Sequence, residues 1–422
     1  MRNHQVRWVP RNTEAITALS FGLRRAQLRQ PQLLTGAIVR GPRIPRMGAL
    51  LTCFAVALIA TLWIARLSRD SNNAAHDSDL TGPQKIHTSP VPRIGGVAVV
   101  CGLIAAAVAT GFEDRGKAMP MWLLLGCATP CFAAGLVEDF TKAVSARRRL
   151  ASTALSAIIA VAVLQSTITY TSIPGLDWIV ALPLGAALVT AFVVTGVASA
   201  INIIDGLNGL SSMCAALILA GVAYVAMQVG DLTVAWLSLA GICALFGFFV
   251  FNYPGGRVFL GDGGAYVVGF YVAEVGILLL HRNPQVSPLC PLLLCIYPVF
   301  ETVFSMYRRR VLRARSPGLP DGIHLHSLIY RRLMRWSAGA VEGKRLTRRN
   351  SMTSPYLWLL CMLAVLPAML FWDNTALLGT LIIAFGFAYT LLYWRIVRFR
   401  SPRWLRAPAR ARRPVGEAPG QG

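Results

Sequence analysis

Acidic side chains stand at three points where long apolar stretches of this sequence break off. Glu138 and Asp139 end one stretch, Asp205 interrupts a second, and Asp262 lies in a glycine-rich interruption of a third. An ionised carboxylate is costly in hydrocarbon, so acids kept at several such places need a favourable partner. These positions predict a shared cation or phosphate site at a membrane surface.

The most specific segment places Asn202, Asp205 and Asn208 at intervals of three residues. In a helix this spacing drifts only modestly around one face, and Gly206 and Gly209 can open the helix so that the three polar groups converge. The alternative is a turn between two helices, built on Asx hydrogen bonds. That alternative accounts for the two Asx-Gly pairs, but not for Asn202 inside the apolar stretch.

Glycine surrounds Asp262 in the sequence Gly261-Asp262-Gly263-Gly264. A glycine-rich backbone that opens a helix can bind phosphate, because free amides and the helix dipole favour anions. An aspartate at this point can hold Mg2+ that bridges phosphates, since hard cations prefer carboxylate oxygen. The alternative is that Asp262 caps its own helix.

The neighbouring acids Glu138 and Asp139 form a weaker signal. Adjacent carboxylates repel each other unless a cation or a proton lies between them. Such a pair either binds a metal or has one member poised as a base.

Two further segments supply cations. Lys85, His87 and Arg93 lie in a proline-stiffened stretch that ends in a glycine pair, which allows close approach to a helix or a phosphate. Binding to lipid headgroups is the alternative for this stretch. His324 and His326 share one side of an extended segment and can grip a pyrophosphate, unless they belong to an uninvolved surface loop.

The elements that position these residues are membrane helices. The chain has 422 residues, 55% hydrophobic and 14% charged, with a mean hydropathy of +0.55. A helix crosses hydrocarbon with roughly 17 to 25 apolar residues. The sequence contains eleven such runs, the ninth short and broken by prolines: 47–65, 94–112, 118–137, 150–168, 178–201, 211–229, 232–251, 263–280, 286–300, 356–372 and 376–394. An all-α membrane protein follows, a polytopic bundle of about eleven (10–11) transmembrane helices.

The formal charge of +23 reflects membrane topology rather than nucleic-acid binding. Arginines and lysines concentrate after the third and ninth runs, whereas alternate loops are short and poor in basic residues. The positive-inside rule therefore places the acidic segments and both basic loops in the cytoplasm. The nine cysteines all lie in apolar runs and predict neither disulfides nor a zinc site.

Three parts are expected along the chain. Residues 47–395 form the membrane domain, and residues 396–422 form an arginine-rich cytoplasmic tail. Residues 1–46 are a basic extension. With eleven helices and a cytoplasmic tail, this extension would lie outside the cell, which contradicts the positive-inside rule. Either the helix count is off by one or this extension is not native, and we expect that translation begins at Met47.

Taken together, the five segments resemble the polyprenyl-phosphate N-acetylhexosamine-1-phosphate transferases of glycosyltransferase family 4, over roughly residues 47–395. Glu138-Asp139 matches the acidic pair of that family, Asn202 and Asp205 its Asn-x-x-Asp-Gly signature, and Asp262 its Phe-x-Gly-Asp segment. His324 and His326 match its histidine motif. The chain departs from the family pattern at five positions, and these departures are typical of the branch that begins O-antigen or exopolysaccharide synthesis: Glu138, Ser199, Asn208, Glu301 and Ser327.

The resemblance implies a multi-pass enzyme of the bacterial inner membrane with a cytoplasmic active-site cleft. Such an enzyme transfers a sugar 1-phosphate from a UDP-sugar to undecaprenyl phosphate and releases UMP. The resemblance also implies Mg2+, with Mn2+ as an alternative, on Asp262 and Asp205. The resemblance implies a catalytic role for five residues: Asp139, Glu138, Asp205, His324 and His326. It implies substrate binding by five others: Lys85, His87, Arg93, Asn202 and Asn208.

Asp139 is the candidate for orienting or deprotonating the lipid phosphate. The expected partners are undecaprenyl phosphate, the UDP-sugar and the bilayer, with no nucleic acid; a homodimer is left open. Two alternatives stay open. One is the peptidoglycan-initiating phospho-MurNAc-pentapeptide transferase, and the other is a transporter of lipid-linked sugars, for which the intramembrane Glu274 is the main indication.

Overall fold

The computed structural model describes residues 47–67, 91–312, 324–333 and 343–398. Within these ranges the chain is helical and has no strand, so the predicted all-α class is confirmed. The basic extension 1–46 and the tail from residue 399 onward lie outside the described residues, as do Lys85 and His87. The predictions made for those segments stay predictions.

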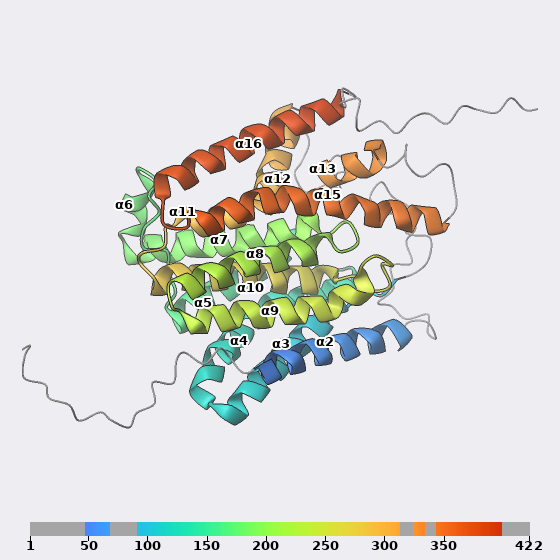
Figure 1. Cartoon of the computed structure of the whole chain (residues 1–422), viewed down its shortest axis with the longest axis horizontal. Helices are drawn as coiled ribbons and strands as arrows, with labels where there is room; N and C mark the ends of the chain where they lie inside the picture. The colour runs from blue at the N-terminus through green and yellow to red at the C-terminus, as the bar shows by residue number, and fades with distance from the viewer. Residues whose placement is uncertain (1–46, 68–90, 313–323, 334–342, 399–422) are drawn as a thin grey trace, which may run out of the picture. The chain divides into compact units, whose positions relative to one another are not determined.

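The helices follow the apolar runs closely (Figure 1). In chain order they are α2 (Met47–Leu67), α3 (Gly95–Glu113), α4 (Arg115–Thr141), α5 (Ala146–Leu164), α6 (Leu176–Val180), α7 (Pro183–Ile204), α8 (Leu210–Gln228), α9 (Leu232–Asn252), α10 (Gly261–Arg282), α11 (Leu289–Leu294), α12 (Ile296–Tyr307), α13 (Leu325–Leu328), α15 (Gly343–Leu370) and α16 (Thr375–Val397). Short π-helical turns follow α12 and α13.

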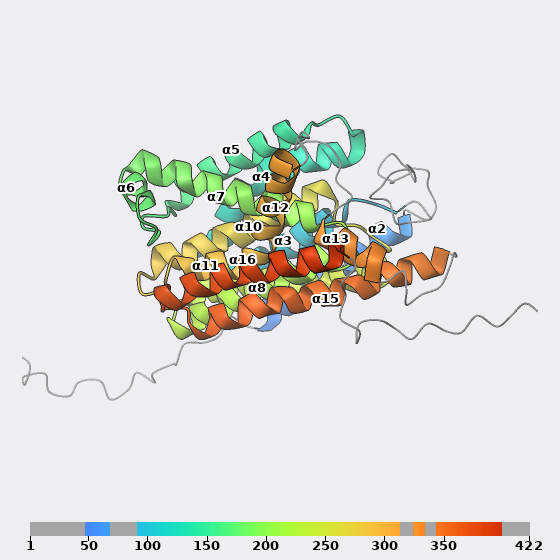
Figure 2. The ribbon, with the colours of Figure 1, turned by 90° about the horizontal axis from the view of Figure 1, so that it is seen from above.

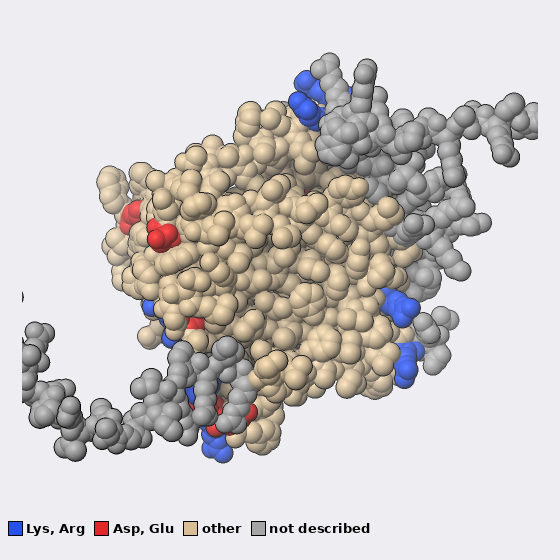
Figure 3. All heavy atoms as spheres, viewed as in Figure 1, with Lys and Arg blue, Asp and Glu red and all other residues tan. Residues whose placement is uncertain are grey.

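Nine of the described helices are long and apolar enough to cross a membrane. The two remaining predicted runs are also helical. One is α5, which begins with three arginines among its first four residues. The other is broken into α11 and α12 at Cys295, where Pro291 and Pro298 each remove a backbone donor. In the face shown in Figure 3, charged side chains lie near the helix ends and the broad middle is uncharged.

Helix α10 lies at the centre of the bundle, and nearly all of its residues are buried. It packs most extensively against α7 and α4, and also against α3, α8 and α9. Figure 2 shows α5 on one side of α10 and α15 on the other. The first residues of α10 are therefore surrounded by the ends of several helices, and this end of the bundle, which carries Asp139, Asp205 and Asp262, is called the site end below.

Glycine pairs allow this crowding at the site end. A Cβ atom on Gly96 of α3 would lie 2.2 Å from the Cα atom of Gly264, and a Cβ atom on Gly135 of α4 would lie 2.5 Å from the Cα atom of Gly263. Real Cβ atoms do not approach so closely, so backbone meets backbone at both places. For the first pair, the predicted close approach is to a helix rather than to a phosphate.

The last described helix, α16, packs against α12 through aromatic rings. Tyr389 contacts Phe300 and Phe304 with ring centroids 5.0 and 5.6 Å apart, and Tyr393 contacts Phe304 at 4.9 Å. Edge-on pairs of this kind fix the relative position of two helices.

Candidate active site

Asp139 caps the central helix. It lies one turn after Gly135, and its two carboxylate oxygens accept hydrogen bonds from the backbone amides of Asp262 and Gly263, each 2.9 Å long. Gly261, with φ of +77°, lies directly against this carboxylate and the Arg93 carbonyl. The carboxylate thus satisfies two amides at the helix start, where the helix dipole favours negative charge. These two amides are therefore not free to bind a phosphate.

The carboxylate of Asp262 faces two other helices. Its Oδ2 atom forms an ion pair with Arg149 of α5, and its Oδ1 atom accepts a 2.9 Å hydrogen bond from the Asn202 side chain of α7. The alternative role as a cap of its own helix is wrong, because Asp139 supplies that cap. Asp262 is instead held by its side chain at the junction of α5, α7 and α10.

Asp205 follows the last residue of α7 and begins the turn to α8. Its Oδ1 atom accepts a 2.5 Å hydrogen bond from the Ser211 hydroxyl. Burial raises the pKa of Asp205 to about 6, although the Ser211 hydroxyl and the charge of Arg93 act in the opposite direction. Asp205 is therefore a partly desolvated acid that a cation would stabilise in its charged form.

Asn208 does not converge with Asn202 and Asp205. Its backbone amide donates to Asn350 of α15, its side-chain amide donates to the Pro254 carbonyl, and its own carbonyl accepts from Ser354. The helix-to-helix turn, considered above as the alternative, describes Asp205 through Gly209. Asn208 connects this turn to α15 and to the loop before α10, and its predicted substrate contact stays untested.

Glu138 points away from its neighbour Asp139. Its Oε2 atom accepts a 2.7 Å hydrogen bond from the backbone amide of Val144, in the loop between α4 and α5. That loop leads into the start of α5, where Ser145 caps the helix and Arg149 follows one turn later. The position of Glu138 therefore supports the loop that presents Arg149.

The two histidines lie together at the site end. Their rings stack in parallel with centroids 5.2 Å apart. The Nδ1 atom of His324 is 3.1 Å from the Glu301 carboxylate, and a Cβ atom on Gly206 would lie 3.0 Å from the Nε2 atom of His326. The structure thus places the histidine segment against the turn that carries Asp205, although the two segments are far apart in sequence.

The oxygen donors suit Mg2+ better than a softer metal. Within the described ranges, no three His, Cys, Asp or Glu side chains come close enough to hold a metal ion by themselves. Mg2+ is commonly held by one or two carboxylates together with waters and substrate phosphates, so the oxygen donors of Asp262 and Asp205 are of the kind that it prefers. A structural zinc site, with four ligands from the protein, does not fit these residues.

Two residues that contact the predicted site residues could not be identified as such from the sequence. Arg149 appeared only as part of a basic loop, and Glu301 only as a departure from a family pattern. Arg149 is three residues beyond the start of α5 and reaches Asp262, which is distant in the chain. Only the arrangement of helices could show either contact.

Glu274, the main indication of a transporter, is fully buried in α10 and accepts a 3.3 Å hydrogen bond from Ser166. This contact joins α10 to the segment after α5, whereas the second carboxylate oxygen, Oε1, is buried without a hydrogen-bond partner among the described residues.

The chain is similar to known membrane transferases. Residues 121–280 match the family described as Glycosyl transferase family 4, a range that contains Asp139, Asn202, Asp205 and Asp262. The chain is 26% identical, over 67% of its length and 77% of the relative, to a Bacillus subtilis protein named probable undecaprenyl-phosphate N-acetylglucosaminyl 1-phosphate transferase.

Two further relatives are similar. A Thermotoga maritima undecaprenyl-phosphate alpha-N-acetylglucosaminyl 1-phosphate transferase is 28% identical over 61% of this chain and 74% of its own length. A Geobacillus kaustophilus phospho-N-acetylmuramoyl-pentapeptide-transferase is 30% identical over 45% of this chain and 61% of its own length, less than two thirds of that protein. These similarities confirm the prediction of a multi-pass membrane enzyme of the sugar-1-phosphate transferase kind, and residues 121–280 are similar to Glycosyl transferase family 4.

Proposed function

We propose that this enzyme transfers a sugar 1-phosphate from a UDP-sugar to undecaprenyl phosphate, releases UMP, and thereby begins O-antigen or another cell-envelope polysaccharide at the bacterial inner membrane. The observation that carries the proposal is Asp262, whose carboxylate is held between Asn202 and Arg149 at the start of the central helix. The names of the Bacillus and Thermotoga relatives support an N-acetylhexosamine as the sugar.

Asp262 and Asp205 are the residues proposed to hold Mg2+. When bound, Mg2+, or Mn2+ in its place, would neutralise charge on the nucleotide diphosphate. The Arg149 guanidinium forms an ion pair with Asp262 and compensates its charge. Arg149 is therefore the cation nearest to the proposed metal ligand, and it can pair with a phosphate oxygen once Asp262 is engaged.

The reaction joins two anions, so the residues around it must lower their repulsion. An oxygen of the lipid phosphate forms a bond to the phosphorus that bears the sugar. The bond from that phosphorus to the bridging oxygen breaks, and UMP leaves with the bridging oxygen. Arg93, His324 and His326 are proposed to bind the phosphates, together with Lys85 and His87.

Asp139 has a second proposed role beside its cap of α10. Although Asp139 is distant from Asp262 in sequence, it accepts a hydrogen bond from the Asp262 amide. Asp139 therefore fixes the position of the first turn of α10 relative to the substrates. To orient or deprotonate the lipid phosphate, as proposed, one carboxylate oxygen of Asp139 must leave the backbone amide that it accepts from and turn to the substrate.

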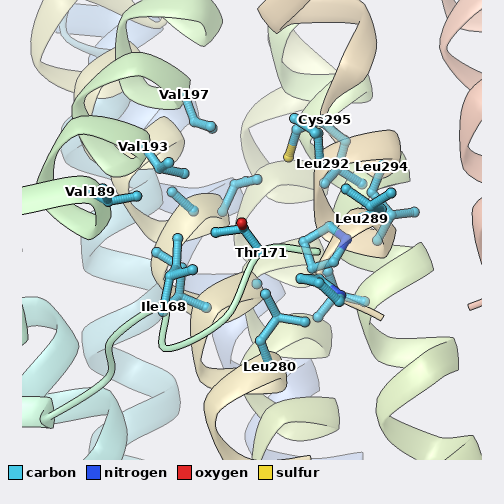
Figure 4. Close-up of a pocket in the computed structure, with 18 of the residues that line it drawn as sticks. Ile168, Thr171, Val189, Val193, Val197, Leu280, Leu289, Leu292, Leu294 and Cys295 are labelled. Atoms are coloured by element: carbon cyan, nitrogen blue, oxygen red, sulfur yellow. The ribbon is translucent and has the colours of Figure 1, made fainter. Parts of the chain in front are cut away.

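An apolar pocket supports the lipid part of the proposal (Figure 4). It has a volume of about 140 Å³ and lies among α7, α8, α10 and α11, next to the break between α11 and α12. Val193, Val197, Ile277 and Leu292 are among its lining residues. We propose that part of the prenyl chain occupies it, because the apolar lining matches a hydrocarbon chain and the van der Waals contacts of the pocket replace those with lipid tails.

The test is UMP release by purified protein with undecaprenyl phosphate and a panel of UDP-sugars. We expect release with at least one UDP-N-acetylhexosamine or deoxy relative, loss of release with EDTA, and recovery with Mg2+ or Mn2+. Release only with UDP-MurNAc-pentapeptide would assign the peptidoglycan reaction instead. Folded protein that releases UMP from no sugar would contradict the proposal and favour transport.

A further inference from the structure

The buried carboxylate of Glu301 connects the histidine segment to the last described helix. Its Oε1 atom is 3.1 Å from the Nδ1 atom of His324 and accepts a 3.1 Å hydrogen bond from the Leu325 amide. Its Oε2 atom accepts a 2.5 Å hydrogen bond from the hydroxyl of Tyr389 on α16. Glu301 and Tyr389 are each 1% exposed, so water does not compete for these contacts.

The contact with Glu301 determines which ring nitrogen of His324 carries a hydrogen and which one can contact a ligand. The Leu325 amide only donates, and an ionised carboxylate only accepts, so the Nδ1 atom of His324 must carry a hydrogen toward Glu301. The Nε2 atom is then the nitrogen left for a ligand. A carboxylate on the far side of an imidazole commonly fixes both its tautomer and its orientation in this way.

Tyr389 is itself held firmly. Its ring packs between Phe300 and Phe304 of α12, the helix that carries Glu301. One turn later on α16, Tyr393 bonds Arg308 rather than Glu301. The two tyrosines thus make similar packing contacts with α12, but only Tyr389 contacts the carboxylate that faces His324.

We propose that Glu301 and Tyr389 are positioning residues that hold His324 with its Nδ1 hydrogen on Glu301 and its Nε2 atom available to the substrate diphosphate. The proposal rests on the proposed function of His324 as a phosphate ligand. It makes α16 part of the active site, although no α16 residue is expected to touch substrate.

The kinetic test compares Glu301→Gln and Tyr389→Phe with the matched control Tyr393→Phe in the UMP-release assay. We expect kcat to fall about 10- to 100-fold for Glu301→Gln, as for other partners that orient a ligand, and several-fold for Tyr389→Phe. Tyr393→Phe keeps the ring packing and removes an acceptor of Arg308 rather than a donor to Glu301, so kcat should stay within about twofold of the parent enzyme. In a His324→Ala background, Tyr389→Phe should cause no further loss, because coupled residues are not additive.

A spectroscopic test works without any reaction. Protein labelled with 15N-histidine, with His324→Ala used for assignment, should show His324 protonated at Nδ1. Glu301→Gln should change the 15N shifts of His324, and Tyr393→Phe should not. Should Glu301→Gln fail to fold, Tyr389→Phe replaces it in both tests.

Unchanged 15N shifts in the Glu301 or Tyr389 variants, or an equal kinetic loss from Tyr389→Phe with and without His324, would overturn the inference. Absence of UMP release from every sugar would contradict the proposed function instead, and the spectrum would still decide the Glu301–His324 contact.

Discussion

The substitution Asp139→Asn separates a structural role of this acid from a chemical one. The two oxygens of Asp139 accept the amides of Asp262 and Gly263, 2.9 Å away in each case. Asparagine keeps one accepting oxygen, but its NH2 group takes the place of the second oxygen and cannot accept a hydrogen bond from the second backbone amide. One buried amide then loses its acceptor, and the helix loses a negative charge at its start, which together cost about 1.5 to 4 kcal/mol.

The same change should reduce turnover, because Asp262 is the second residue of the capped helix. A displacement of about 1 Å in a catalytic group can reduce the rate roughly 100-fold. We therefore expect Asp139→Asn to lower both the free energy of unfolding and kcat. Thermal unfolding in detergent and UMP release, measured on one preparation, provide the two readouts.

The control is Asp114→Asn, which changes an exposed cap at the start of α4. Asp114 accepts from the amides of Gly116 and Lys117 through one oxygen, Oδ1, which asparagine keeps, so the change removes only the charge and the exposed ion pair with Lys117. We expect a cost of at most about 1 kcal/mol and normal turnover. Full stability of Asp139→Asn with no turnover would refute the cap argument and assign Asp139 to the chemistry. Full stability with normal turnover would remove Asp139 from both roles.

Three further predictions concern the metal site and the topology. Asp262→Asn should abolish UMP release while the protein stays folded, and near-normal release would exclude Asp262 as a metal ligand. Arg149→Gln should lower the half-saturating Mg2+ concentration roughly two- to fivefold, the equivalent of an ion pair worth about 0.5 to 1 kcal/mol, and should also lower kcat; an unchanged Mg2+ titration would show that the ion pair does not compete with the metal. In a variant without native cysteines, Ser145→Cys should resist an impermeant thiol reagent in intact cells and Ser172→Cys should react, and the reverse pattern would invert the bundle.

Much of the helical fold could be predicted because membrane helices depend on local composition. Each of the eleven apolar runs contains a helix. The ninth run, predicted to be either broken by its prolines or completed by the residues up to Tyr307, is broken at Cys295, and its second part, α12, ends at Tyr307. The short helix α6 was joined to the fifth run, because Trp178 and its apolar neighbours extend the pattern without a polar interruption. Local hydrophobicity finds the helices, but it does not separate a short surface helix from the span that follows.

The candidate site could be predicted only as a set of residue types. Asp262 and Asn202 do meet, as a shared polar site requires, but Asn208 belongs to a turn. Their partners could not be predicted, since the contacts join Arg149 to Asp262 and Glu301 to His324 across different helices. One sequence specifies which residues lie at helix ends, whereas helix packing decides which ends meet.

The glycine pairs explain how this packing produces a charged site inside a membrane protein. Asp139 can reach the first amides of α10 because Gly135, one turn earlier, allows the backbone of α4 to touch Gly263. A Cβ atom at Gly135 would force the two helices apart and draw the carboxylate away from the amides that it caps. Asp262 would move with those amides and lose its place between Asn202 and Arg149. The distances within the site are thus determined by residues that have no side chain.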